Sequence, residues 1–237
     1  MNKVEQYFMQ AKGNRWFHYF AVFCRVALAL GFMISGIVKI RGERFAAGLS
    51  VNNPMGHYLE ALYHTEYYYT FIGISQVIIA LLLLLPRTAF LGALMYFPVI
   101  LNICILAHAV RFEGTRITTF MVLANLYLLC WDYDRVKQLV SYKPVKENKA
   151  PATQHKLSHQ FPYLFFGSVI AILVAVVVIN IYMYDIRPGN SMEECTNGCP
   201  GNMNPTACEA FCDCLYNKGK SFDTCLDEYN ISKKNKQ

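Results

Sequence analysis

Charged residues are scarce in this sequence. Only 16% of its 237 residues are Asp, Glu, Lys or Arg, whereas 54% are hydrophobic and 14% are aromatic. This composition is typical of a membrane protein. The chain has no run of basic residues interleaved with aromatic residues, so we expect no nucleic-acid partner, and we interpret the net charge of +6 as a determinant of membrane topology.

The familiar catalytic motifs are also absent. The chain contains no H-E-x-x-H, G-x-S-x-G, P-loop or G-x-G-x-x-G sequence. Its long apolar segments contain no C-x-x-C pair, which argues against thiol redox chemistry in the bilayer. Cys24, Cys104 and Cys130 occur singly there, where a free cysteine behaves as a small hydrophobic residue. We therefore predict no catalytic residue and no metal site, and we favour a non-enzymatic role.

The first apolar segment, residues 17–40, organises the rest of the chain. At about 1.5 Å per residue it is long enough to cross a hydrocarbon core of about 30 Å. Arg25 lies inside it, and a buried arginine needs polar partners on other helices or a wet cavity. Ser35 and Gly36 allow another backbone to approach closely near its far end. This segment is therefore predicted to form one wall of a helical bundle.

Further apolar segments supply the other walls, at residues 68–86, 88–110 and 117–134. Only Pro86 and Arg87 separate the first two of these, so the two helices are expected to be antiparallel neighbours. Residues 41–66 are too polar to cross a membrane and suit interfacial helices. A fifth segment, residues 161–184, carries no charged residue and is apolar all round. It is predicted to form an anchor helix at the edge of the bundle.

The polar segments set the predicted orientation. Residues 1–16 form a polar lead-in, and residues 135–160 form a linker with six Lys or Arg residues against Glu147 alone. Basic loops stay in the cytoplasm, which places the N-terminus and this linker inside and residues 185–237 outside. The expected location is the bacterial cytoplasmic (inner) membrane, with an extracytoplasmic C-terminal domain.

Six cysteines crowd into this C-terminal domain. They are Cys195, Cys199, Cys208, Cys212, Cys214 and Cys225. An even number of cysteines in so short a segment predicts disulfides and an oxidising compartment. The absence of histidine from the segment disfavours a zinc site, and a redox-active C-x-x-x-C pair is the other alternative.

Two helices are predicted in this domain, at residues 205–217 and 221–231, with a turn between them. If they fold back on each other, Cys212 and Cys225 lie at equal height, which predicts a bridge between them. Cys195 and Cys199 are then expected to pair with Cys208 and Cys214. The sequence leaves open which of the first two bonds to which of the second two.

The polar residues within the apolar segments fall into two layers. Near the inner end, Arg25 and Asn125 lie at a similar depth. One interpretation is a buried cation that holds a substrate or quinone carbonyl. The structural alternatives are a hydrogen bond between Arg25 and Asn125, or an Arg25 side chain that extends to the inner interface. The outer layer comprises Lys39, Arg41, Gln76, Asn102, His108, Arg111 and Arg116. With few acids nearby, it is a candidate site for an anion, a lipid head group or a quinone oxygen, or else a set of contacts to lipid phosphates and loop acids.

Several of these features resemble the DoxX family over about residues 20–136. The resemblance rests on Arg25, the SGIVKI stretch at Ser35–Ile40, the run ALLLLLPR, Gly92 and Ala93, and the late Asn102 and His108. It implies a four-helix membrane bundle, with Gln76 where many members carry a glutamate. It also implies the roles described for relatives: membrane subunits of quinone-linked sulfur-oxidising or oxidative-stress assemblies, or membrane chaperones. Residues beyond the fourth span lie outside the family pattern.

Taken together, the sequence predicts an all-α membrane protein with a four-helix transmembrane bundle, one anchor helix and a small disulfide-rich helical domain outside the membrane. Our first functional hypothesis is an accessory or scaffold subunit that docks a membrane or periplasmic protein partner through the exported domain, without a cofactor. The second hypothesis is a small membrane subunit of a quinone-linked redox complex, whose outer polar layer holds the quinone.

Overall fold

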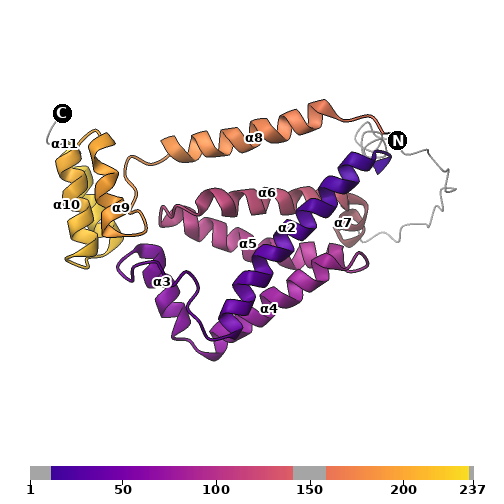
Figure 1. Ribbon diagram of the computed structural model, residues 1–237, viewed down its shortest axis with the longest axis horizontal. Coiled ribbons are helices and arrows are strands. Elements are labelled where there is room, and N and C mark those ends of the chain that lie inside the picture. Colours follow the sequence, from indigo (N-terminus) through magenta and orange to yellow (C-terminus); the bar gives the residue numbers. More distant parts are fainter. Residues whose placement is uncertain (1–11, 141–158, 235–237) are drawn as a thin grey trace.

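The computed structural model describes residues 12–140 and 159–234, and helices dominate both ranges (Figure 1). No β-strand forms within these two ranges, and the predicted all-α fold class is confirmed. Most of the predicted polar lead-in lies outside the described residues, as do the basic positions from Lys143 to Lys156 in the predicted linker.

Four helices that alternate in direction form the bundle: α2 (Arg15–Ile40), α4 (Tyr67–Leu84), α5 (Ala89–Ala109) and α6 (Thr115–Trp131) (Figure 1). α2 packs most extensively on α4, α5 lies against α4 and α6, and α6 closes back on α2. The short turn at Pro86 and Arg87 joins α4 to α5, as predicted. A short helix, α7 (Tyr133–Val140), follows α6.

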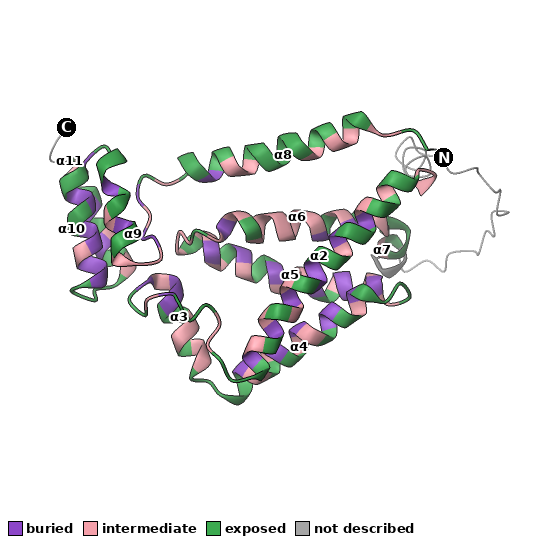
Figure 2. Ribbon diagram, viewed as in Figure 1, coloured by how far each residue is buried: buried purple, intermediate pink, exposed green. Residues whose placement is uncertain are grey.

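Within the described ranges, four helices are long and apolar enough to cross a membrane, namely α2, α4, α5 and α8 (Tyr163–Tyr182). α6 is also apolar but has 17 residues, about 25 Å at about 1.5 Å per residue. The predicted fourth span, residues 117–134, ends earlier than expected because the chain leaves helical geometry at Asp132. Large apolar side chains such as Phe71 and Ile105 are exposed on the outer faces, as in a protein surrounded by lipid (Figure 2).

Two glycines set the distance between α2 and α4. A Cβ added to Gly36 would lie 2.7 Å from the Gly73 carbonyl oxygen, and a Cβ added to Gly73 would lie 2.8 Å from the Gly36 carbonyl oxygen. Both contacts are shorter than real Cβ contacts, so the two backbones approach as closely as glycine permits. The close approach predicted from Gly36 is confirmed.

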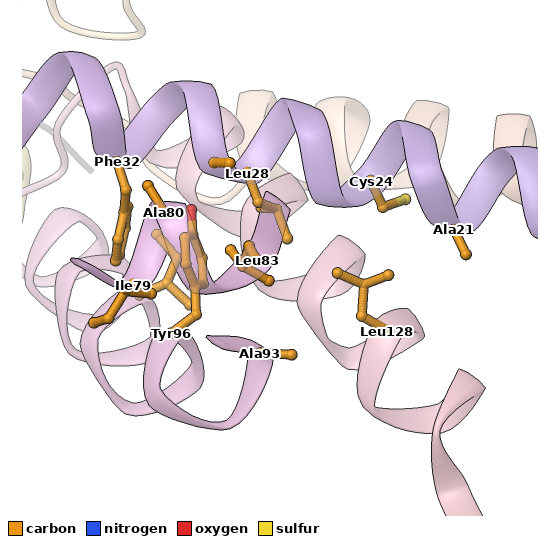
Figure 3. Packing of buried hydrophobic residues seen from close by; sticks show 12 residues of the cluster. Ala21, Cys24, Leu28, Phe32, Ile79, Ala80, Leu83, Ala93, Tyr96 and Leu128 are labelled. Atoms are coloured by element: carbon orange, nitrogen blue, oxygen red, sulfur yellow. The ribbon is translucent and has the colours of Figure 1, made fainter. Parts of the chain in front are cut away.

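The core of the bundle is packed between α2, α4, α5 and α6 (Figure 3). The aromatic rings of Phe32 on α2 and Tyr96 on α5 stack with centroids 3.8 Å apart. Leu28, Leu83 and Leu128 fill the space beside them, and all three are almost completely buried. The interior of the bundle is therefore formed by interlocking side chains from all four helices.

The segment between α2 and α4 contains a single helix, α3 (Pro54–Tyr63), within the predicted interfacial residues 41–66. The Asn53 side chain caps it by accepting from the backbone N–H groups of Met55 and Gly56 at 2.9 and 3.2 Å. Pro54 occupies the first helical turn, where its missing N–H costs nothing. Asn53 and Pro54 together therefore mark the start of α3.

α8 lies at the edge of the bundle, as predicted for an anchor helix, and packs chiefly along α6 (Figure 1). Aromatic rings hold its beginning: Phe165 lies 4.5 Å from Phe17, and Phe161 lies 4.9 Å from Trp16, between ring centroids. Only 6% of its most apolar window is buried. Most of α8 is thus left for lipid to cover.

The C-terminal domain contains α9 (Met192–Asn197), the 3-10 helix η1 (Cys199–Gly201), α10 (Pro205–Tyr216) and α11 (Phe222–Lys234). The helices predicted at residues 205–217 and 221–231 are confirmed. Disulfides are confirmed as well, and they join Cys195 to Cys212, Cys199 to Cys208 and Cys214 to Cys225. Their sulfurs form a second core with Phe211, Leu215 and Tyr229.

The predicted Cys212–Cys225 bridge is wrong. Cys212 lies on the side of α10 that faces α9 and bonds to Cys195, whereas Cys214, two positions on, faces α11 and bonds to Cys225. Along the axis of α10, Cys214 lies about 3 Å from Cys212, the residue expected at the height of Cys225. The Cα atoms of Cys214 and Cys225 are nevertheless only 5.7 Å apart. The side of α10 on which each cysteine lies therefore decides the pairing, rather than its height along the helix. Of the other bonds, Cys199–Cys208 is among the pairings left open, and Cys195–Cys212 is not.

The two ends of the bundle carry different parts of the chain. At one end Lys12 pairs with Asp134 at 2.5 Å, and the Trp16 indole donates to the His159 carbonyl at 3.4 Å. The start of α2, α7 and the start of α8 therefore lie together. α3, the α5–α6 turn and the cysteine-rich domain gather at the opposite end (Figure 1).

Candidate functional site

The structure divides the predicted outer polar layer into two separate groups. One group, at the α2–α4 interface, comprises Lys39 and Gln76. The other, at the turn between α5 and α6, comprises His108, Arg111 and Arg116. The remaining members, exposed on the surface and belonging to neither group, are Arg41 and Asn102. The seven residues therefore do not line one common site.

Lys39 is buried at the end of α2 and only 5% exposed. Its ammonium donates to the Ser35 hydroxyl at 2.6 Å and to the Ser35 carbonyl at 3.2 Å, and it lies 4.5 Å from the centre of the Phe45 ring. The Ser35 hydroxyl donates in turn to Gln76 Oε1 at 3.2 Å. A neutral hydroxyl and an aromatic face thus stabilise the charge, and the three polar side chains tie α2 to α4.

Ser35→Ala is expected to destabilise the protein more than Lys39→Met. Loss of the shared hydroxyl leaves the Lys39 ammonium and the Gln76 amide short of a partner in an apolar interface, which costs about 1–3 kcal/mol. Lys39→Met removes the buried charge and keeps a side chain of similar length, so we expect a cost below about 1 kcal/mol. Unfolding in sodium dodecyl sulfate, followed by circular dichroism, ranks the variants, and the reverse order would contradict the shared role of Ser35.

The second group fastens the end of α5 to the segment after α8, and we call it the α5–α6 clamp. The Tyr184 hydroxyl donates to the His108 carbonyl at 3.0 Å and lies 3.3 Å from His108 Nδ1. His108 Nε2 lies 3.3 Å from the Thr119 hydroxyl on α6. Arg111 donates to the Ile186 carbonyl at 3.1 Å, and its guanidinium lies 5.0 Å from the centre of the Tyr184 ring. The clamp joins the bundle to the start of the cysteine-rich domain.

Arg111 occupies a backbone conformation that usually belongs to glycine. Its φ is +52°, and the next N–H, of Phe112, bonds back to the Ala107 carbonyl at 2.9 Å, as in the common glycine-terminated helix end. The left-handed conformation costs a residue with a side chain about 1–2 kcal/mol. From this conformation the Arg111 side chain reaches the Ile186 carbonyl and the Tyr184 ring.

A second set of contacts joins α3 to the cysteine-rich domain, and we call it the α3 clamp. The Asn53 amide donates to the Gly189 carbonyl at 2.6 Å and to the Tyr216 hydroxyl at 3.3 Å, while its oxygen caps α3. Asn52 donates to the Tyr216 carbonyl at 2.8 Å, and the Tyr216 hydroxyl donates to the Pro188 carbonyl at 3.1 Å. Burial raises the pKa of Tyr216, so its hydroxyl stays protonated as a donor.

One part of the α3 clamp has a recognisable sequence signal. Asn53 before Pro54 is a helix-start signal, but its free amide group could not be assigned to a partner 136 positions away in the chain. Tyr216 stands at the end of a predicted helix with no feature to mark its contact with α3. Both residues were therefore missed as candidates.

The predicted inner pair of Arg25 and Asn125 is not formed. Asn125 is completely buried and donates to the Ala93 carbonyl on α5 at 3.1 Å. Arg25 instead extends toward the end of α6, where its guanidinium lies 3.8 Å from the Asp132 carboxylate. The flexible arginine side chain reaches an acid nearer the interface, as in the alternative in which it extends to the inner surface. Asp132, directly after Trp131, was the available sequence signal for this partner.

Arg25→Leu is expected to destabilise the protein by about 1 kcal/mol, because Asp132 loses the guanidinium 3.8 Å away while Arg135 still lies at 4.0 Å. Asp132→Asn should have a similar effect, and the double variant should cost less than the sum. A double-mutant cycle with unfolding free energies measures this coupling. Strict additivity would contradict a direct Arg25–Asp132 interaction.

Three sulfurs of the cysteine-rich domain lie close enough together to resemble a metal site, since those of Cys199, Cys208 and Cys212 are within 4.8 Å of one another. All three atoms belong to disulfides. Metal binding by cysteine requires the thiolate, so in this oxidised form the cluster is a pair of neighbouring bridges.

Comparisons with known proteins give little information about this site. No family model and no solved structure matches the chain. The chain is similar to the uncharacterized protein YwoB of Bacillus subtilis (strain 168), with 27% identity over 130 residues, which are 51% of this chain and 82% of that protein. The resemblance to the DoxX family therefore stays a prediction.

Proposed function

We propose that this protein is a membrane scaffold or accessory subunit that presents its disulfide-linked domain in a fixed orientation to a protein partner. The bundle supplies the membrane attachment, and the domain supplies a docking surface at one end of it. In this proposal the bundle is DoxX-like, the N-terminus is cytoplasmic, and the domain faces the extracytoplasmic side of a bacterial inner membrane. No cofactor is needed.

The observation that carries this proposal is the double attachment of the cysteine-rich domain. The α3 clamp holds it through Asn53 and Tyr216, and the α5–α6 clamp holds its leading segment through Arg111 and Tyr184. A domain that was only tethered to an anchor helix would not require hydrogen bonds both to α3 and to the end of α5. Fixed orientation lowers the entropy cost of binding a partner.

The quinone-linked hypothesis receives less support from the same residues. Lys39, Gln76, His108 and Arg111 were expected to present polar atoms to a ligand, but they make contacts within the protein. Their positions are explained by joining helices and by holding the domain. We therefore favour the scaffold role.

The proposed orientation rests on two features that agree. Disulfides persist in oxidising compartments, which favours an extracytoplasmic location for the domain. The predicted basic linker begins at α7 and leads to the start of α8, at the end of the bundle opposite the domain. Basic segments are retained in the cytoplasm, so one orientation satisfies both requirements.

Photo-crosslinking in native membranes tests the docking role. A photoreactive amino acid at the exposed positions Glu209 or Asp227 in the domain should give an adduct of one defined mass, and the same probe at exposed Arg87 at the opposite end should give none. Adducts confined to Arg87, or none at any position, would contradict the scaffold role. Stoichiometric quinone in the purified protein, without adducts at Glu209 or Asp227, would favour the redox hypothesis.

A further inference from the structure

Asn180 is the only buried residue of α8, at 4% exposed, and lies in the last turn of that helix. Its side-chain oxygen accepts two hydrogen bonds from arginines of different segments. Arg116 Nε on α6 donates at 3.3 Å, and an Arg187 guanidinium nitrogen donates at 3.1 Å. Arg187 also donates to the Asn180 carbonyl. Two guanidinium groups therefore converge on one neutral amide.

The two guanidinium groups at this point form no direct ion pair with a carboxylate of a described residue. The neighbouring acid Glu113 instead accepts from the Asn190 amide at 3.1 Å. Burial lowers the pKa of Arg187 and the charge of Arg116 lowers it further, while Glu113 and Tyr184 oppose this shift. Each guanidinium carries more N–H donors than Asn180 can occupy, so donors remain for an anion.

The two arginines lie beside an exposed apolar surface, an arrangement that matches the head group and acyl chains of a lipid. They lie at the end of α8, whose middle part exposes apolar side chains such as Ile170 (61% exposed) and Val174 (56%) (Figure 2). A phospholipid beside α8 has its acyl chains along this apolar surface and its phosphate at the depth of the helix end. Free phosphate would match the charge but not the apolar surface.

We propose that Arg116 and Arg187 bind the phosphate of one anionic phospholipid, whose acyl chains cover the exposed apolar surface of α8 next to α6. Guanidinium groups suit phosphate because they donate paired hydrogen bonds to its oxygens. Asn180 keeps the two side chains together at the site. The lipid belongs to the leaflet on the side of the cysteine-rich domain, and its binding does not depend on the scaffold role.

Native mass spectrometry of the full chain in mild detergent tests this site. The probes are phosphatidylglycerol and phosphatidylcholine with identical acyl chains. We expect the protein to retain one phosphatidylglycerol in preference to phosphatidylcholine. The double variant Arg116→Gln/Arg187→Gln should bind phosphatidylglycerol at least about tenfold more weakly, the loss expected for one charge-assisted hydrogen bond. Arg41→Gln, which removes an exposed arginine at the same end of the bundle, should bind as the unchanged protein does.

Three results would overturn the proposal. Equal retention of the two lipids by the unchanged protein would remove the requirement for an anionic head group, whatever the folding of the variants. Equal loss of binding in Arg41→Gln and in the double variant would indicate general surface charge. Displacement of the lipid by millimolar inorganic phosphate, with phosphate bound in its place, would make the site a phosphate site without a lipid.

Discussion

Gly36→Ala is expected to lower the unfolding free energy by about 2–3 kcal/mol, although alanine is the better helix former. The added Cβ would lie 2.7 Å from the Gly73 carbonyl oxygen and 2.8 Å from Val77 Cγ2. The carbonyl belongs to the α4 backbone and cannot rotate away, so α2 and α4 must move apart. This separation would also stretch the contacts of Lys39, Ser35 and Gln76 that cross the same interface.

Two other glycines serve as matched controls for Gly36→Ala. Gly167→Ala lies in α8 with no atom within 4 Å of the added Cβ, so it should be neutral or slightly stabilising. Gly31→Ala lies on α2 itself, but its new Cβ meets only the flexible end of Met121, at 2.9 Å, and should have a smaller effect. Unfolding free energies in detergent compare the three. A cost for Gly167→Ala equal to that for Gly36→Ala would contradict the backbone-contact explanation.

Asn53→Asp is expected to release the cysteine-rich domain from α3 at a cost of about 2–3 kcal/mol. Asp retains the oxygen that caps α3, so the helix should persist. The change replaces the buried amide donor by a carboxylate facing the Gly189 carbonyl, which the amide now contacts at 2.6 Å. The variant thus separates capping from docking at a single position.

Asn53→Ser and Tyr216→Phe resolve the contributions to the α3 clamp. Asn53→Ser keeps a capping oxygen, loses the amide donor and adds no charge, so its effect should be smaller than that of Asn53→Asp. Tyr216→Phe removes the hydroxyl that meets both Asn53 and Pro188. Hydrogen exchange of α11 and α3 backbone amides measures the outcome. Unchanged exchange of the domain in Asn53→Asp would contradict the clamp.

The membrane helices could be predicted from the sequence because hydropathy and helix length are local properties. Gly36 marked a close helix contact for the same reason, since only a residue without a side chain allows it. The end of α6 was placed too late, at residue 134 rather than Trp131, because Asp132 ends the helix within a stretch that still contains aromatic residues. The end of a helix depends on a single capping residue, whereas hydropathy is averaged over many residues and does not locate that residue.

The candidate site was predicted less well because its contacts join distant parts of the chain. Lys39 and Gln76 of the outer layer are buried, but nothing local indicated that His108 meets Tyr184 or that Lys39 meets Ser35 and Phe45. The disulfide error had a similar origin. Height along a hairpin can be calculated from residue numbers, whereas the face that Cys214 presents to α11 depends on how the two helices pack.

The most direct test of the central claim is the distance between the cysteine-rich domain and α3 in lipid bilayers. Spin labels attached to non-natural amino acids at exposed Tyr58 on α3 and exposed Glu209 on α10 leave every native cysteine in place. A second label pair, at Glu209 and Asp227 within the domain, provides a rigid reference. We predict that double electron–electron resonance gives one narrow distance distribution for Tyr58–Glu209, as narrow as the reference, and that Asn53→Asp broadens it. A broad distribution in the unchanged protein, beside a narrow reference, would contradict a domain held in fixed orientation on the bundle.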